Sequence, residues 1–459
     1  MGDSLTRRKR FSFTPEGGMF SGRALAALIL PLIVEQFLAV LVGMADTVMV
    51  TDTGENAVSA VSLVDTLNVL LIQVFSAMGA GGAIIAAQYL GHKDLPNACD
   101  ASKQLMLSSL ILSTLVAVPV AIFRGPMLGL IYGRLDEDIL RQAEDYLLLS
   151  ALSYPFLALY NGGVGLLRAM GNSKSSMWTS LVMNLINIAG NALLIYGCGL
   201  GVVGAGAASL LSRAVSALII LKLLFNPHLP AHLEKHKGWR LEWGMIRRIM
   251  QVGVPNGLEN GLFQVGKLVI AGVLAALPAS MIAANAICNS VSSVVNIPGN
   301  AMALASITVI GQCMGAGDVR QARAYGNRML GLMYASVFPT NLLLLLFPAF
   351  FAGIFNISPA GTEASIEIMR LYAIFSIILW TPSFGLPNLL RAAGDARYTM
   401  AVSMVSMLVL RLGMCYLMVY AMDLGLLGIW LAMFADWAAR AAFFVTRYLN
   451  GKWLRHKLI

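Results

Sequence analysis

Two carboxylates, Glu35 and Asp46, stand in one apolar stretch near the start of the chain. Their spacing of 11 residues is roughly 20° more than three helical turns, so both would lie on one face of a helix. A charge inside a bilayer costs about 2.5–3.5 kcal/mol on insertion scales, so such a residue suggests a function by default. A carboxylate there can exchange a proton or bind a cation. We interpret both residues as ion-coupling; the alternatives are an interfacial position for Asp46 and an interhelical hydrogen bond for Glu35.

Three asparagines farther along the chain share one spacing pattern. Asn184, Asn187 and Asn191 are separated by three and four residues, which places them on one stripe of a helix. Amides can hydrogen-bond a protonatable carboxylate and hold water in a cavity, so we add them to the predicted ion-coupling site. The alternative role is to join helices through hydrogen bonds.

A second polar group lies in residues 248–277, where Glu259 is followed by Asn260, Gln264 and Lys267. A membrane helix with these side chains must face another helix or a wet cavity. Lys267 could pair with Glu259 or bind a substrate, and the sequence leaves both open. The residues predicted to line a substrate cavity are Glu259, Asn260, Gln264, Lys267, Asp65, Asn68 and Asn289.

The chain contains an internal repeat. Pro31 and Glu35 recur as Pro255 and Glu259, an offset of 224 residues (259 − 35). Two motifs recur at nearly the same offset: Gln-x-x-Gly-x-x-Asp, beginning at Gln88 and Gln312, and Leu-Leu-Arg-Ala-x-Gly, at residues 166–171 and 389–394. Transporters built from two such halves place the substrate site where the halves meet. The duplication therefore predicts a site between the halves.

The Gln-x-x-Gly-x-x-Asp motifs suit the ends of helices. Gly91 and Gly315 fit helix C-caps, and Asp94 and Asp318 fit the start of the next short amphipathic turn. We interpret both motifs as structural.

The composition predicts a polytopic membrane protein. Of 459 residues, 58% are hydrophobic and 12% are charged, whereas soluble domains carry about 25% charged residues. Long runs without charge argue against a β-barrel, whose strands alternate in polarity. Twelve helices are expected at roughly 23–50, 56–91, 103–124, 140–168, 174–197, 201–225, 248–277, 281–315, 326–354, 363–391, 397–421 and 425–448.

Six helices in each half is an even number, so the halves would enter the membrane in the same direction, as parallel repeats. We expect an all-α fold of two six-helix lobes. The N-terminal lobe would cover residues 1–225, a cytoplasmic linker 226–247, and the C-terminal lobe with its cytoplasmic tail 248–459.

The net charge of +9 is distributed between apolar runs rather than gathered in a nucleic-acid-binding patch. Lys and Arg, including Arg168 and Arg391, are expected in the connections after even-numbered helices, and most of the opposite connections lack them. This asymmetry predicts cytoplasmic N- and C-termini in the cell membrane. The first apolar run is interpreted as a start-transfer helix rather than a cleaved signal peptide.

The linker contains three histidines, His228, His232 and His236, at spacings that would share a helical face. Pro227 and Pro230 break such a helix. We therefore expect a solvated linker without a metal site, and the five scattered cysteines indicate no disulfide framework or zinc site.

Several of these motifs together resemble the multidrug and toxic compound extrusion (MATE) transporters. They are Pro31-Leu-Ile-Val-Glu-Gln with Asp46-Thr-Val-Met, Ala87-Gln-Tyr-Leu-Gly-x-x-Asp94, Leu-Leu-Arg-Ala-x-Gly-Asn172, and the asparagine-rich stretch. The resemblance covers about residues 22–447 and implies a V-shaped pair of lobes. It also implies export of cationic or amphipathic compounds in exchange for protons or sodium.

By this resemblance, Asp46 matches the aspartate of the family's first helix. Asn187 and Asn191 match a pair of residues on the family's fifth helix, in which some members have an acid at the second position. The family's seventh-helix acid falls about four residues after Glu259, and no acidic match stands near Trp380. These departures weigh against a sodium site in the second lobe and favour proton coupling in the first.

The predicted function is ion-coupled antiport by alternating access, with a proton or Na⁺ as the coupling ion and no other cofactor. The alternative is a lipid-linked precursor flippase of the same architecture. Flippases tend to have a more cationic cavity, and among residues expected deep in the membrane only Lys267 and Arg411 are basic, the latter a candidate buried pair with Asp436. An enzyme is not expected, because no nucleophile or metal cluster is evident. The expected partners are the lipid bilayer and small molecules, and we expect a monomer.

Overall fold

The computed structural model describes residues 18–133, 136–234, 240–355 and 357–459, and the regular structure in these ranges is helical. The first half contains α1 (Gly22–Thr51), α2 (Glu55–Gly91), α3 (Leu95–Ile122), α4 (Arg124–Tyr132), α5 (Glu137–Ala169), α6 (Ser173–Asn191), the π-helical segment η1 (Ala192–Gly197) and α7 (Gly201–Leu224). The α-helices of the second half are α8 (Trp243–Ala275), α9 (Ala279–Val295), α10 (Ile297–Gly315), α11 (Val319–Leu346), α12 (Pro348–Gly353), α13 (Pro359–Trp380), α14 (Leu386–Ala392), α15 (Ala396–Val405), α16 (Met414–Tyr416) and α17 (Gly425–Leu449). This half also contains three π-helical segments, η2 (Thr381–Gly385), η3 (Ser406–Gly413) and η4 (Leu417–Ala421), and one 3₁₀-helix, η5 (Lys452–Arg455).

In the described ranges, 12 helical stretches are long and apolar enough to cross a membrane. This confirms the predicted all-α fold with twelve transmembrane helices. The stretch predicted at 281–315 is divided at Asn296 into α9 and α10. Pro298 lies in the first turn of α10, where its missing N–H disturbs the backbone least.

Helices α3 and α11 begin earlier than predicted, at Leu95 and Val319. In each case an aspartate caps the first turn: the Asp94 side chain accepts from the Asn97 N–H, and the Asp318 side chain from the Gln321 N–H. Such caps satisfy a backbone donor that the helix leaves free. The motif aspartates therefore start the long helices α3 and α11 directly, not the short amphipathic turn that was predicted.

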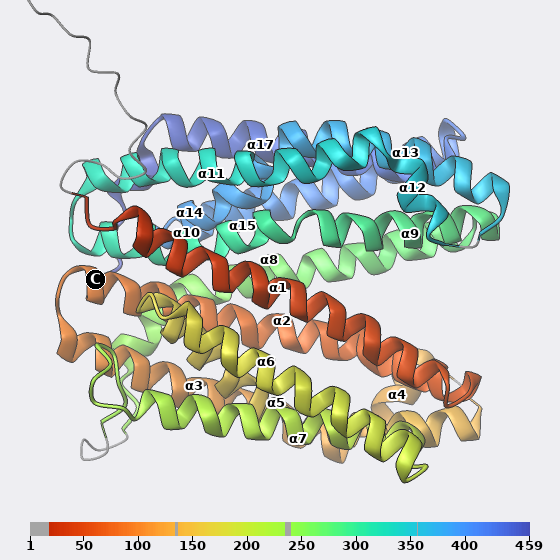
Figure 1. The fold of residues 1–459 in the computed structure, drawn as a ribbon, viewed down its shortest axis with the longest axis horizontal. Helices are drawn as coiled ribbons and strands as arrows, with labels where there is room; N and C mark the ends of the chain where they lie inside the picture. The colour runs from red at the N-terminus through yellow and green to blue at the C-terminus, as the bar shows by residue number, and fades with distance from the viewer. Residues whose placement is uncertain (1–17, 134–135, 235–239, 356) are drawn as a thin grey trace, which may run out of the picture.

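The two halves form two bundles that together make a V (Figure 1). They converge at the end where α2 and α10 finish, and they lie apart at the opposite end. We call the convergent end the closed end. Helix α1 begins beside the second bundle and crosses to the first, and α8 begins beside the first bundle and crosses to the second. Leu28 and Leu32 of α1 pack into the hydrophobic core of the second bundle, and Met245 and Ile249 of α8 pack into that of the first.

Two reciprocal hydrogen bonds join the bundles at the closed end. Gln88 Nε2 donates to the carbonyl of Ala392 at 2.9 Å, and Gln312 Nε2 donates to the carbonyl of Ala169 at 2.8 Å. Each glutamine belongs to one repeated motif, and each alanine belongs to the other motif in the opposite half. We call this pair of bonds the glutamine latch.

The motif glycines have a different role from the predicted C-cap. Gly91 and Gly315 are the last residues of α2 and α10, and the left-handed backbone falls two residues later, at Lys93 and Gly317. A Cβ atom on Gly91 would collide with the Gln312 carbonyl, and one on Gly315 with the carbonyl of Gln88. These glycines therefore allow the two backbones to approach closely.

Candidate functional site

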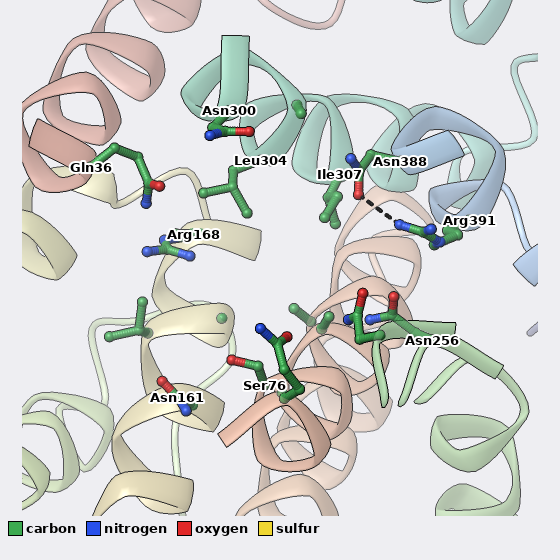
Figure 2. A pocket seen from close by; sticks show the side chains of 18 of the residues that line it. Gln36, Ser76, Asn161, Arg168, Asn256, Asn300, Leu304, Ile307, Asn388 and Arg391 are labelled. Atoms are coloured by element: carbon green, nitrogen blue, oxygen red, sulfur yellow. Dashed lines mark hydrogen bonds between the residues drawn. The ribbon is translucent and has the colours of Figure 1, made fainter. Parts of the chain in front are cut away.

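A cavity of about 650 Å³ lies between the two bundles (Figure 2). Its wall is rich in amides: Gln36, Gln73, Asn161, Asn184, Asn256, Asn260, Asn300 and Asn388. Its charged residues are Glu35, Arg168, Glu259, Arg391 and Arg440, and Tyr160, Phe263 and Phe384 add aromatic surface. Both halves contribute to the wall, so the cavity lies where the repeat predicts a substrate site.

Two glutamate–arginine pairs stand in this cavity at equivalent positions of the repeat. Arg168 Nη2 lies 2.6 Å from Glu35 Oε1, and Arg391 Nη2 lies 2.6 Å from Glu259 Oε1. Ser176 also donates to Glu35, at 3.0 Å. Figure 2 shows Arg168 and Arg391 on opposite sides of the cavity. Each glutamate therefore forms an ion pair with an arginine from its own half of the chain.

This arrangement corrects one expectation and excludes one of two open alternatives. Arg168 and Arg391 were expected in cytoplasmic connections, but each lies in the last turn of a helix and turns its long side chain back into the cavity. Glu259 pairs with Arg391, not with Lys267. The sequence repeat already indicated this pairing, because each half contains both an arginine in the Leu-Leu-Arg-Ala-x-Gly motif and a glutamate four residues after the repeated proline.

Asp46 has a separate set of partners, and the structure does not bring it together with Glu35. Asn191 Nδ2 donates to Asp46 Oδ1 at 2.8 Å. The amide of Asn187 faces both Asp46 and Ser209. The orientation that satisfies both places its nitrogen 2.7 Å from Asp46 Oδ1 and its oxygen 3.2 Å from Ser209 Oγ. Two of the three predicted asparagines therefore hold this carboxylate, while Asn184 lines the cavity.

A second carboxylate, Asp65, lies close enough to Asp46 to interact with it electrostatically. It accepts hydrogen bonds from Asn68 Nδ2 at 3.1 Å and from the Tyr146 hydroxyl at 3.3 Å. Arg213 of α7 interacts electrostatically with both carboxylates and donates to Ser153. Sequence reasoning missed Arg213, although a basic residue in the middle of an apolar run was a usable signal.

The second half has a group of cations around one aromatic ring, and one of them, Arg411, stands at the repeat position of Asn187. Lys267, Arg411 and Arg440 all lie near the ring of Phe263. The predicted pair of Arg411 and Asp436 is present, with 3.8 Å between Arg411 Nη1 and Asp436 Oδ2. Arg440, which sequence reasoning missed, approaches Asp436 more closely, at 3.0 Å from Nε to Oδ1.

Only part of the predicted substrate wall lines the cavity. Glu259 and Asn260 do, whereas Gln264, Lys267, Asp65, Asn68 and Asn289 lie outside it. The cavity lies toward the closed end. The five residues outside it lie farther along their helices, toward the end where the bundles separate. The expectation that only Lys267 and Arg411 are deep cations was also wrong, because three other arginines line the cavity: Arg168, Arg391 and Arg440.

The linker is less solvated than predicted. Ala231 and Leu233 are buried in the core of the first bundle. His232 Nδ1 lies 2.9 Å from the Leu229 carbonyl and 3.8 Å from Cys99 Sγ, and the ligand atoms of Cys99, His232 and Glu234 lie within 4.8 Å of one another. His236 lies outside the described residues.

Comparisons with known proteins agree with the fold and the duplication. The MatE family model matches residues 31–193 and 255–417, two stretches whose starts and ends are both 224 residues apart. The chain is 24% identical to the uncharacterized transporter YisQ of Bacillus subtilis over 442 residues, covering 94% of this chain and 95% of YisQ. It is 26% identical to the probable multidrug resistance protein NorM of Thermotoga maritima over 449 residues, covering 95% and 94%.

A solved structure of similar fold is described as the outward-facing conformation of a multidrug resistance MATE family transporter of the MOP superfamily. It superposes with a TM-score of 0.87 at 20% identity and covers 95% of this chain and 97% of its own. The matched family model extends over more than half of this sequence. This chain therefore belongs to the MATE family of membrane transporters.

Proposed function

We propose that the protein is an antiporter that exports cationic or amphipathic drug-like molecules by alternating access, driven by an ion gradient. The family membership and the name of the Thermotoga maritima relative support export of drugs. The cavity between the two bundles supports a central substrate site that opens to one side at a time.

One observation carries the coupling assignment. Asp46 stands in a membrane-spanning helix and is held by neutral amides, and no Lys or Arg of the described residues forms an ion pair with it. Glu35 and Glu259, in contrast, have arginine partners. A carboxylate without a direct salt bridge can change its protonation state without breaking an ion pair, and Arg213, which acts on Asp46 electrostatically, also interacts with Asp65. Asp46 is therefore the coupling group in this proposal, and Glu35 belongs to the cavity's ion pairs.

The surroundings of Asp46 suit a group that takes up and releases a proton. Asn191 Nδ2 donates to the carboxylate, and the Asn187 amide lies against both Asp46 and Ser209, so that it can turn either end toward the carboxyl group. An amide N–H stabilises the ionised carboxylate, and an amide oxygen accepts a hydrogen bond from the protonated one. The choice of a proton over sodium rests on the missing acidic match near Trp380.

The closed end supplies the gate in this proposal. The glutamine latch and the two glutamate–arginine pairs lie there, and the distribution of Lys and Arg supports a cytoplasmic location for this end in a cell-membrane protein. Substrate would enter after the latch opens, and protonation of Asp46 would favour one arrangement of the bundles. We also propose that a single chain suffices, because both halves of the cavity come from it.

Purified protein in liposomes tests this proposal. Efflux of the cationic dye rhodamine 6G is measured with a proton gradient alone and with a sodium gradient alone. We expect the proton gradient to drive efflux and the sodium gradient to leave it at the level of empty liposomes. Sodium-driven efflux would overturn the choice of ion, and no efflux under either gradient would overturn the function. Asp52→Asn is the matched control for Asp46→Asn, since Asp52 follows the end of the same helix and bonds only Tyr196 among the described side chains.

A further inference from the structure

Three cations surround one phenyl ring in the second half of the chain. Lys267 Nζ lies 5.0 Å from the ring centroid of Phe263, and the guanidinium carbons of Arg411 and Arg440 lie 5.1 and 5.4 Å from it. The four residues come from α8, η3 and α17. We call them the Phe263 cluster.

The cluster carries more positive than negative charge. Asp436 is the carboxylate that pairs with its members, at 3.0 Å from Arg440 and 3.8 Å from Arg411. No carboxylate of the described ranges lies within ion-pair distance of Lys267. Three cations and one anion leave two positive charges uncompensated. The face of an aromatic ring attracts cations but does not neutralise them.

One donor of the cluster lacks a hydrogen-bond partner. Arg411 is only 9% exposed, and in the described part of the chain its Nε makes no hydrogen bond. Asp436 Oδ2 also makes none, although it lies 3.8 Å from Arg411 Nη1, so this carboxylate does not satisfy the guanidinium. Buried guanidinium N–H groups are normally satisfied, because an unmade bond costs the full desolvation of the donor. An oxyanion would accept from Arg411 and supply negative charge that Asp436 alone does not.

The cluster borders the cavity. Phe263 and Arg440 are part of the cavity wall, and Lys267 lies one helical turn beyond Phe263 toward the open end. Across the repeat, Arg411 occupies the position of Asn187, at the offset of 224. The half that holds Asp46 and Asp65 therefore faces a half whose equivalent region is cationic.

We propose that the Phe263 cluster binds an oxyanion group of the transported molecule, a carboxylate or a phosphate. The substrate class is then an amphipathic zwitterion or organic anion, in which the anionic end lies at Lys267, Arg411 and Arg440. This inference rests on the proposed transport function and narrows the class of molecule carried.

Two dyes with one skeleton test the inference. Rhodamine 6G is an ethyl ester and a cation, and rhodamine 19 is its free acid and a zwitterion. Their Kd values are measured by fluorescence anisotropy with purified protein. We expect the free acid to bind about tenfold more tightly, the change that one charge-assisted contact gives. Lys267→Met removes the charge from a chain of similar shape and should abolish this preference, with the Kd of the ester unchanged.

Two matched variants distinguish the effect of losing the positive charge of Lys267 from the effect of a structural change. Lys267→Arg should keep the preference, and Lys222→Met, on α7 outside the cluster, should behave as the wild type. The inference is wrong if the ester binds as tightly as the free acid, or if Lys267→Met weakens both dyes equally.

Two further measurements cover the remaining outcomes. If neither dye binds, Tm is compared in sodium phosphate and in sodium chloride of equal ionic strength. A larger gain in phosphate for wild type than for Lys267→Met supports the oxyanion site, and equal gains reject it.

In liposomes, export of the ester but not of the acid rejects the site while the proposed function stands. Export of neither dye, with phosphate stabilisation dependent on Lys267, rejects the proposed function and leaves an anion site.

Discussion

The side-chain amide of Gln88 donates a 2.9 Å hydrogen bond to the main-chain carbonyl of Ala392, which belongs to the opposite half of the chain. The repeat duplicates this bond, so that Gln312 donates to Ala169 at 2.8 Å. The two motifs begin 78 residues apart in the first half (166 − 88) and 77 in the second (389 − 312), and these bonds join them between halves. The latch fastens the closed end without joining the bundles covalently, which suits a joint that must open.

Removing the latch should open the closed end, which is cytoplasmic in the proposed orientation. In the double variant Gln88→Leu and Gln312→Leu, two carbonyls lose their donors, and each hydrogen bond contributes about 0.5–1.5 kcal/mol. The open state should then gain about 2 kcal/mol, or roughly 30-fold in population. Distances between spin labels at Leu95→Cys and Val319→Cys, both exposed at helix starts and placed in a Cys198→Ser background, report the change.

The double variant should lengthen the mean label distance, and each single variant should have a smaller effect in the same direction. Gln73→Leu, a cavity glutamine of α2 away from the latch, should leave the distance unchanged. An unchanged distribution in the double variant would show that the latch does not hold the closed end.

Gly91→Ala should prevent full closure of the same end. The new Cβ atom meets the main chain of Gln312, which cannot move aside as a flexible side chain could. Overpacking of this kind costs about 1–3 kcal/mol. Gly129→Ala is the control, because no atom lies within 4 Å of its added Cβ.

The readout is labelling of Ser76→Cys by a membrane-impermeant maleimide in inside-out vesicles, because Ser76 lines the cavity. Gly91→Ala should accelerate the labelling and Gly129→Ala should not. Equal rates in the two variants would contradict the role of Gly91.

The pair of Glu35 and Arg168 should show strong coupling in stability. Arg168→Met leaves the Glu35 carboxylate buried without its cation, which costs about 3–5 kcal/mol for a fully buried pair and less here, because Arg168 is 19% exposed. Adding Glu35→Gln removes the stranded charge and should restore part of the Tm. A double-mutant cycle should give a coupling energy of about 1–3 kcal/mol. Purely additive losses would show that the two groups do not stabilise each other.

Much of the fold followed from the sequence because apolar runs and duplicated motifs report on local structure. Helical spacing placed Asn184, Asn187 and Asn191 on one stripe, and in the structure Asn187 and Asn191 lie against Asp46 whereas Asn184 lines the cavity. The carboxylate they hold, Asp46, stood out because an acid inside a membrane helix is costly.

The partners of the cavity glutamates could not be read in the same way. Lys267 lies eight residues after Glu259, which is about 12 Å along a helix and beyond direct contact. Arg391 is distant in sequence and stands at a helix end, where a basic residue ordinarily faces water. Only tertiary packing turns its side chain into the cavity, and helix periodicity does not contain that information.

The central claim is that Asp46 exchanges a proton for substrate, and the Asp46→Asn variant tests it most directly. Asparagine keeps the shape of the protonated acid but cannot release a proton. In liposomes without a gradient, Asp46→Asn should still exchange labelled for unlabelled rhodamine 6G. With a proton gradient it should fail to move dye against its concentration, whereas wild type and Asp52→Asn should succeed. Gradient-driven transport by Asp46→Asn at the wild-type rate would contradict the claim.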